Sequence, residues 1–379
     1  MKAVLAIDSF KGSLSSIEAG EAVKKGILRV YKDSEISVIP IADGGEGTTE
    51  ALTKGMGGRL QSISVTGPLG DTVDAVYGII NDNLAVMEMS AAAGLTLIEE
   101  NKRNPLHTTT LGVGEMIKDA IDKGIRHFIV GIGGSATNDG GAGMLQALGY
   151  DLIDETGASI SSGAQGLSKL TVIRSDHILH ELDDCTFRIA CDVNNPLCGK
   201  NGASAVYGPQ KGATPGMIEL MDSWLERYAG IASKLKPDAD PRYPGSGAAG
   251  GLGFAFHTFL NASLEPGIKI VLEETGLEKH IRDADLVITG EGRLDSQTIM
   301  GKAPAGVAEL AKKYGKPVIA LSGSAASDAS VCNEYGIDAY FPALREIMTL
   351  DEAMDPKTAA MNLTDTAEQV FRLIHICKE

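Results

Sequence analysis

Several short apolar runs in this sequence end in residues that could bind phosphate or a metal ion. The most informative run, 127–130, leads into the glycine-rich stretch 131–143, and a segment typical of a helix start follows it. A glycine loop between a strand and a helix lets backbone N–H groups approach an anion closely, and the first turn of the helix adds unpaired donors. The predicted phosphate contacts are Gly133, Gly134, Ser135, Thr137, Gly140 and Gly141.

A second interpretation of this stretch stays open at this point. Glycine-rich turns are common between elements of structure. Asn138 or Asp139 would then cap the helix that follows, without any ligand.

Carboxylates and cations follow the other apolar runs. The runs and the residues after them are 4–7 with Asp8 and Lys11, 38–41 with Asp43, Gly44 and Gly45, 187–190 with Asp192, and 286–288 with Glu291, Arg293 and Asp295. In parallel α/β sheets, ligands bind at the carboxyl ends of the strands, so these ends predict one large polar cleft. Carboxylates repel a phosphate unless a cation lies between them, which favours a nucleotide bound with Mg²⁺.

Length and charge narrow the class of protein. A chain of 379 residues is too long for one ordinary core, which predicts two domains. The net charge of −16 argues against nucleic acid or an anionic membrane as a partner. The five cysteines include no C-x-x-C pair, and the chain opens directly on a strand. We therefore expect a reduced, cytoplasmic protein without a signal peptide.

The order of the apolar patterns predicts that one domain interrupts another. The first fifty-odd residues read as strand, helix, strand, helix, with a capping box at Ser15 and Glu18. Three strands joined by short turns then follow between 60 and 89, as in an antiparallel meander. Alternation of strands and helices returns from 268 onward. We predict an α/β core domain at 1–58 plus 262–379 and an inserted domain at 59–261.

Several common motifs are missing or weak. The sequence has no P-loop, no protein-kinase signature and no G-x-S-x-G elbow. The stretch 245–250 matches the glycine pattern of dinucleotide-binding loops, but no buried strand precedes it. His177 and His180 are metal ligands by type, although an exposed helix explains them as well. The residues alone thus predict a two-domain α/β enzyme for a small phosphorylated ligand.

Six longer strings carry a resemblance to a known family. They are Asp8-Ser-Phe-Lys-Gly, Ala42-Asp-Gly-Gly-Glu-Gly-Thr, Gly133-Gly-Ser-Ala-Thr-Asn-Asp-Gly-Gly, Cys191-Asp-Val-Asn-Asn-Pro-Leu, Gly247-Ala-Ala-Gly-Gly-Leu-Gly and Thr289-Gly-Glu-Gly-Arg-Leu-Asp-Ser-Gln-Thr. In this order, and over almost the whole chain, they resemble the type I glycerate kinases. The resemblance implies ATP-dependent phosphorylation of D-glycerate, with 2-phosphoglycerate favoured over 3-phosphoglycerate as the product. It also implies two α/β domains: a flavodoxin-like parallel-sheet core interrupted by a mixed α/β inserted domain, with the active site in the cleft between them.

Physical reasoning then gives each candidate residue a role. Asp192 orients the substrate hydroxyl or accepts its proton, with Asp8 or Asp43 as the next candidate. Lys11 and Arg293 neutralise the substrate carboxylate. The predicted Mg²⁺ ligands are Asp295, Glu291 and Asp43, and Gly44 and Gly45 join the phosphate-binding glycines. The expected partners are D-glycerate and ATP, and the expected assembly is a monomer or homodimer.

Two other functions remain open from the sequence. A non-catalytic sensor of nucleotides or sugar acids would keep the glycine loops but would not need many convergent carboxylates. A nicotinamide-dependent dehydrogenase would rest on the weak match at 245–250 alone. Lys11 could also be a solvated surface lysine, and Asp43 could serve as a helix cap.

Overall fold

The structure, a computed structural model, describes residues 1–377 and divides into two compact units. The first unit contains Met1–Asp43, Lys54–Gly57 and the chain from Ile268 onward, and the second contains Gly44–Thr53 and Gly58–Gly267. Helix α2 (Thr48–Gly55) spans this division. The predicted domain boundaries, at 58/59 and 261/262, remain a prediction.

The first unit is built on a five-stranded parallel sheet. Its strands are β1 (Lys2–Ile7), β2 (Glu35–Val38), β11 (Leu286–Gly290), β13 (Val318–Ser322) and β15 (Ala339–Pro342). Their order across the sheet is β15-β13-β11-β1-β2, and every pair is parallel. Counted along the chain this order is 2-1-3-4-5, the flavodoxin arrangement. The predicted flavodoxin-like core is therefore confirmed.

Helices cover both faces of this sheet. The helices and short elements of the first unit are α1 (Ser16–Val30), α10 (Gly267–Glu274), α11 (Leu277–Asp283), β12 (Arg293–Leu294), α12 (Ala303–Lys313), β14 (Ser324–Ala325), η5 (Ala329–Tyr335), α13 (Leu350–Met354) and α14 (Pro356–Ile376). In β1, Ala3, Leu5 and Ile7 pack into one core with α1 and α14. Val4 and Ala6 point to the opposite face and are also buried, where α11 and α12 contact β1. Burial on both faces is usual for a parallel sheet.

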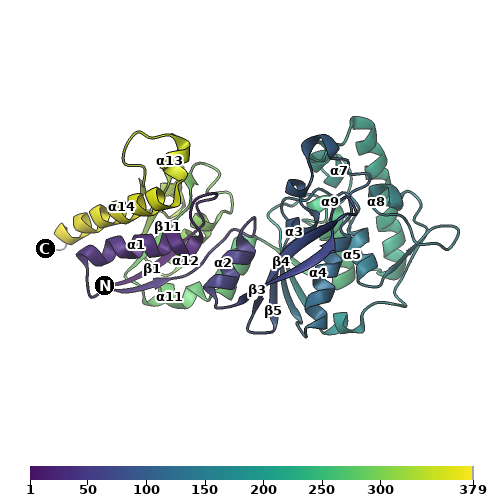
Figure 1. Ribbon diagram of the computed structural model, residues 1–379, viewed down its shortest axis with the longest axis horizontal. Coiled ribbons are helices and arrows are strands. Elements are labelled where there is room, and N and C mark those ends of the chain that lie inside the picture. The colour runs from purple at the N-terminus through teal and green to yellow at the C-terminus, as the bar shows by residue number, and fades with distance from the viewer. Residues whose placement is uncertain (378–379) are drawn as a thin grey trace. The chain divides into compact units, whose positions relative to one another are not determined.

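Helix α1 begins at the predicted capping box. The hydroxyl of Ser15 accepts the amide of Glu18 at 3.3 Å, and the carboxylate of Glu18 accepts the amide of Ser15 at 2.9 Å. The helix then runs beside α14, as Figure 1 shows. A Cβ at Gly26 would lie 2.2 Å from the carbonyl oxygen of Thr364, so the two helices can approach this closely only because Gly26 has no side chain.

The second unit has a mixed six-stranded sheet. Its strands are β3 (Arg59–Thr66), β4 (Thr72–Ile80), β5 (Leu84–Glu88), β6 (His127–Gly131), β9 (Thr186–Ala190) and β10 (Ser263–Glu265). Their order is β10-β9-β6-β5-β4-β3, in which the three strands β3 to β5 are antiparallel and β5, β6, β9 and β10 are parallel. The predicted antiparallel meander is thus confirmed, and it continues into a parallel half.

The remaining elements of the second unit lie between or after these strands. They are α3 (Ser90–Ala93), η1 (Leu95–Leu97), η2 (Glu100–Lys102), α4 (Leu111–Asp122), α5 (Ala142–Ala147), β7 (Asp151–Ile153), α6 (Ala164–Leu167), β8 (Val172–Arg174), η3 (His180–Asp184), α7 (Ala203–Tyr207), η4 (Pro209–Lys211), α8 (Pro215–Leu235) and α9 (Ala248–Leu260). Strands β7 and β8 form a small antiparallel pair. Among the described residues, no helix is long and apolar enough to cross a membrane.

A pair of glycine substitutions tests the close packing of α1 on α14. Gly26→Ala should lower the free energy of unfolding by about 1–3 kcal/mol, because the new methyl group overlaps the backbone of α14. Gly230→Ala, on an exposed side of α8 with nothing within 4 Å of the new Cβ, should raise it by about 0.5–1 kcal/mol. Urea unfolding followed by circular dichroism measures both changes. Wild-type stability of Gly26→Ala would contradict the packing described here.

Candidate functional site

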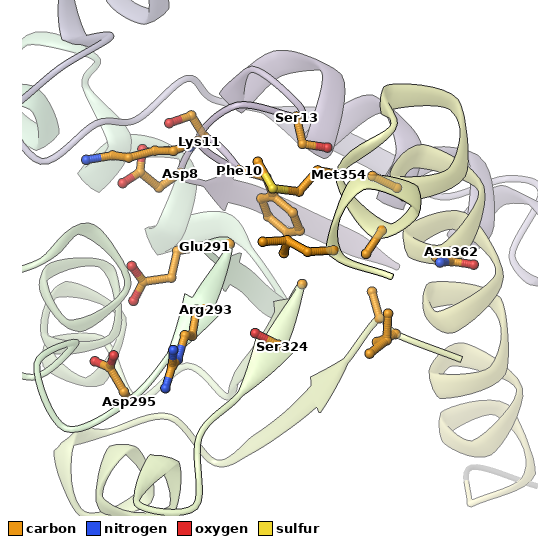
Figure 2. Close-up of a pocket in the computed structure, with 18 of the residues that line it drawn as sticks. Asp8, Phe10, Lys11, Ser13, Glu291, Arg293, Asp295, Ser324, Met354 and Asn362 are labelled. Carbon is orange, nitrogen blue, oxygen red and sulfur yellow. The ribbon is translucent and has the colours of Figure 1, made fainter. Parts of the chain in front are cut away.

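The first unit carries a pocket of about 690 Å³ at the carboxyl ends of its strands. Residues directly after β1, β11, β13 and β15 line it, and Arg293 of β12 and Ser324 of β14 lie side by side in a short parallel pair. Figure 2 shows Asp8, Lys11 and Glu291 on one side of the pocket, together with Arg293. The pocket lies where the order of the sheet reverses, between β1 and β11, which is the usual ligand position in such folds.

Asp8 is the most perturbed carboxyl group of this pocket. It is buried, with 5% of its surface exposed, and the amide of Ser9 donates to its Oδ1 at 2.7 Å. Burial, together with the negative charges of Asp43 and Glu291, raises the pKa of Asp8 to about 7, although the Ser9 amide and Lys11 oppose the rise. A carboxyl with a pKa near 7 can both accept and release a proton at physiological pH.

Glu291 is the second buried carboxyl of the pocket. Its pKa is raised, mainly by burial, while the hydroxyl of Thr298 donates to Oε1 at 2.6 Å and Lys302 lies 3.7 Å from Oε2. The nearby charges of Asp295 and Asp43 also raise it. A divalent cation would relieve this mutual repulsion, because carboxylate oxygens are the ligands that Mg²⁺ prefers.

The three predicted Mg²⁺ ligands thus all line one pocket, together with Asp8. Within residues 1–377, no three side chains of the ligating types are close enough to hold a metal ion by themselves. Mg²⁺ is usually bound by one or two carboxylates, with waters and substrate phosphates completing the shell, so the oxygen donors present fit this ion.

The other side of the pocket is apolar. Phe10 and Met354 lie away from the charged cluster in Figure 2, and further apolar residues come from the chain before α13 and from that helix. Lys302 is a cation of the pocket that sequence reasoning missed, since it sits eleven residues after Glu291 and becomes a neighbour only through the turn before α12.

The second unit carries a smaller pocket of about 240 Å³. It is lined by the first part of the predicted glycine loop, Gly133, Gly134 and Ser135, together with Gly44 and Gly45. Asp192 lines it too, and its Oδ1 accepts the amide of Gly267 at 3.0 Å. The structure therefore places Asp192 in this pocket and Asp8, Lys11 and Arg293 in the pocket of the first unit.

The second part of the glycine loop does not line this pocket. Thr137 is fully buried, and Gly140 and Gly141 pack against the side chains of α8 and α9. A Cβ at Gly141, where φ is +77°, would lie 2.4 Å from that of Ala255. These three residues, expected to contact phosphate, instead hold the loop on the core, because apolar helices from elsewhere in the chain cover them.

Asp139 has the capping role that the sequence left open. Its oxygens accept the amides of Gly141 at 3.1 Å and Gly143 at 3.3 Å at the start of α5, and the amide and hydroxyl of Thr110, each at 2.9 Å. Burial raises its pKa, against these hydrogen bonds. The carboxylate thereby ties the start of α5 to the start of α4.

The remaining sequence candidates have local roles. Glu88 accepts the amides of Gly47 and Thr49 near the start of α2. The imidazole Nδ1 of His177 lies 2.7 Å from a carboxylate oxygen of Asp151, and His177 is in a turn rather than on the helix expected. The stretch 245–250 follows a turn and is buried, although Ala248 and Ala249 within it line the pocket of the second unit. It lacks the preceding strand that a dinucleotide loop requires.

Comparison with known proteins gives a consistent family. The model of the glycerate kinase family matches residues 3–375. Glycerate 2-kinase of Escherichia coli K12 is 50% identical over 354 residues, which is 93% of each chain, and glycerate kinase of Bacillus subtilis 168 is 46% identical over all of this chain and 99% of the relative. A crystal structure of a protein assigned as glycerate kinase 2 from Salmonella typhimurium LT2 superimposes with a TM-score of 0.93 and 47% identity, covering 100% of this chain and 99% of that one.

The comparisons define the class of this α/β protein as a kinase. The chain belongs to the glycerate kinase family. The resemblance seen in the sequence strings is thereby confirmed over nearly the whole chain.

The buried carboxyl of Asp8 predicts how stability depends on pH. Its pKa is about 7 in the folded chain and near 3.8 when unfolded, so folding takes up a proton between these values. The free energy of unfolding of wild type should therefore fall, relative to that of Asp8→Asn, as the pH rises from 4 to 7. The asparagine of the variant does not titrate, so the stability of the variant lacks this pH dependence. One pKa unit corresponds to ~1.4 kcal/mol. The difference in unfolding free energy between Asp8→Asn and wild type should therefore be larger at pH 8 than at pH 4 by at most about 4 kcal/mol.

Urea unfolding at both pH values, without divalent cations or substrates, measures this difference. Asp33→Asn, which removes an exposed carboxylate of the same unit, is the control. If Asp8→Asn changes the free energy of unfolding by the same amount at both pH values, the surroundings of Asp8 do not keep this carboxyl protonated.

Proposed function

We propose that this protein transfers the γ-phosphoryl group of ATP to a hydroxyl of D-glycerate. The family supports the substrate, and the Escherichia coli relative, named glycerate 2-kinase, favours 2-phosphoglycerate over 3-phosphoglycerate as the product. The single observation that carries the proposal is a buried carboxyl, Asp8, with a pKa of about 7 beside the cations of one pocket. Such a group suits proton removal from an alcohol at neutral pH.

The pocket of the first unit has the chemistry to bind the acceptor. Glycerate carries one carboxylate and two hydroxyls, and Lys11 and Arg293 line this pocket and can neutralise the carboxylate. Asp8 then accepts the proton of the hydroxyl as its oxygen attacks phosphorus, and ADP leaves. A protonated Asp8 gives that proton to solvent after the product departs.

The pocket of the second unit has the chemistry to bind phosphate. Gly133 and Gly134 expose their backbone to it, and Ser135 adds a hydroxyl. Phosphoryl transfer requires positioning and neutralisation of charge more than covalent chemistry, which backbone donors supply without adding bulk. We assign the phosphates of ATP to this pocket and give Asp192 a part in orienting them through bound water.

Glu291, Asp295 and Asp43 would hold Mg²⁺ through their carboxylate oxygens. When bound, this ion supplies positive charge against the phosphate oxygens. Glu291 is positioned for this role by the hydroxyl of Thr298, which leaves its second oxygen facing Lys302.

Location and assembly are part of the same proposal. We propose a cytoplasmic enzyme on the basis of its cysteine content and its net charge of −16. The proposed assembly is a monomer or homodimer.

Product analysis tests the proposed reaction. Purified protein with D-glycerate, ATP and Mg²⁺ should release ADP in a coupled assay, and the phosphorus NMR spectrum of the product should be that of 2-phosphoglycerate. A 3-phosphoglycerate spectrum would support the kinase activity but show that the other hydroxyl of glycerate is phosphorylated. Binding of both substrates without ADP release would support a sensor instead.

Two matched substitutions separate the proposed base from the group in the second pocket. Asp8→Asn should lower kcat by about 10²–10⁴-fold, because Asn cannot accept the hydroxyl proton. Asp192→Asn should lower kcat less than about tenfold, since an amide oxygen can still accept the Gly267 amide. Steady-state kinetics at saturating Mg²⁺ measure both. A larger loss in Asp192→Asn than in Asp8→Asn would exchange the two assignments.

A further inference from the structure

Lys211 is a fully buried cation that no sequence motif marked. It ends the short helix η4, has 1% of its surface exposed, and lines the pocket of the second unit. Its Nζ donates to the hydroxyl of Ser135 at 2.7 Å and to the carbonyl of Thr137 at 2.6 Å. An ammonium has three N–H donors, so one remains beyond these two bonds.

The surroundings of Lys211 do not neutralise its charge by direct contact. Burial lowers its pKa to about 7, and only the more distant charge of Asp139 opposes this. The carboxylate of Asp139 is itself occupied by the amides of Gly141 and Gly143 and by Thr110. A buried ammonium without a paired anion is costly, so a negatively charged ligand in this pocket would gain strongly from meeting it.

The backbone beside Lys211 offers further donors. Across residues 1–377, the amides of Gly133, Gly134 and Ser135 have no hydrogen-bond acceptor within reach. The loop is held in place instead by its carbonyl groups, because Gly134 accepts the amide of Leu95 at 2.9 Å. Successive unpaired amides of this kind form a concave anion site, and here they adjoin the hydroxyl that Lys211 contacts.

We propose that Lys211, the hydroxyl of Ser135 and the amides of 133–135 together form an oxyanion site in the pocket of the second unit. A volume of about 240 Å³ is sufficient for one phosphate or carboxylate group. The identity of its natural ligand rests on the proposed function, which offers two oxyanions: a phosphate of ATP and the carboxylate of glycerate. Either oxyanion would accept hydrogen bonds from the amides and a charged one from Lys211.

Binding measurements on one variant and one control test this site. Lys211→Met removes the charge but keeps a long unbranched side chain, and Lys200→Met removes an exposed charge of the same unit. Isothermal titration calorimetry with inorganic phosphate, ADP and D-glycerate, each alone, gives three dissociation constants for each protein. Thermal unfolding shows whether each variant is folded.

Loss of a charged hydrogen bond should weaken the affected ligand by about 10- to 100-fold in Lys211→Met, with wild-type binding in Lys200→Met. Weaker phosphate and ADP with unchanged D-glycerate would identify the site as the one for phosphate. Weaker D-glycerate alone would identify it as the one for the carboxylate. Wild-type affinity of folded Lys211→Met for all three ligands would overturn the inference.

A second variant keeps the test valid if Lys211→Met does not fold. Ser135→Ala leaves the bond of Lys211 to Thr137 intact and removes one neutral donor, so the same ligand should bind about 2- to 10-fold more weakly. Unchanged binding by this variant would overturn the inference as well.

The inference and the proposed function can fail separately. Phosphate binding that depends on Lys211, in a protein that does not release ADP with D-glycerate, keeps the site and rejects the reaction. If the protein turns over D-glycerate but neither Lys211→Met nor Ser135→Ala changes ligand binding, the reaction is supported and the site is rejected.

Discussion

The parallel pairing of β1 with β11 is the constraint on which the first pocket depends. Ile7 pairs with Gly290 across 283 residues of chain, so the next residues, Asp8 and Glu291, leave the sheet side by side. Burial at this edge raises the pKa of each carboxyl, and the negative charge of Asp43 adds to the rise. The proposed proton transfer and cation binding at this pocket would thus both depend on one strand register.

A second register has the same effect in the other unit. Gly131 of β6 pairs with Ala190 of β9, which brings the start of the glycine loop beside Asp192. The loop then turns inward, and Asp139 and Lys211 hold it from within through hydrogen bonds to its backbone. Within the described residues, these inner bonds leave the amides of 133–135 at the outer end of the loop without an acceptor.

The sequence was most informative where local pattern and ligand chemistry coincide. Short apolar runs ending in glycine or acid predicted the strand ends, and the flavodoxin-like sheet confirms that these runs are strands of one parallel core. The capping box at Ser15 and the meander of β3 to β5 were also predictable, because each depends on residues a few positions apart. The structure shows which pocket Asp192 and Lys11 each line. The chemical roles of these two residues remain predictions.

What the sequence determined by itself is the set of chemical groups: glycine amides, carboxylates and cations at the ends of apolar strands. Tertiary structure alone decided which of them meet. It placed Asp192 and Asp8 in the pockets of different units, and it buried Gly140 and Gly141 under α8 and α9. It also brought Lys211 to Ser135 across 76 residues. The physical reason is that burial and charge depend on contacts between distant segments, and no local pattern encodes the register or the helix packing that creates those contacts.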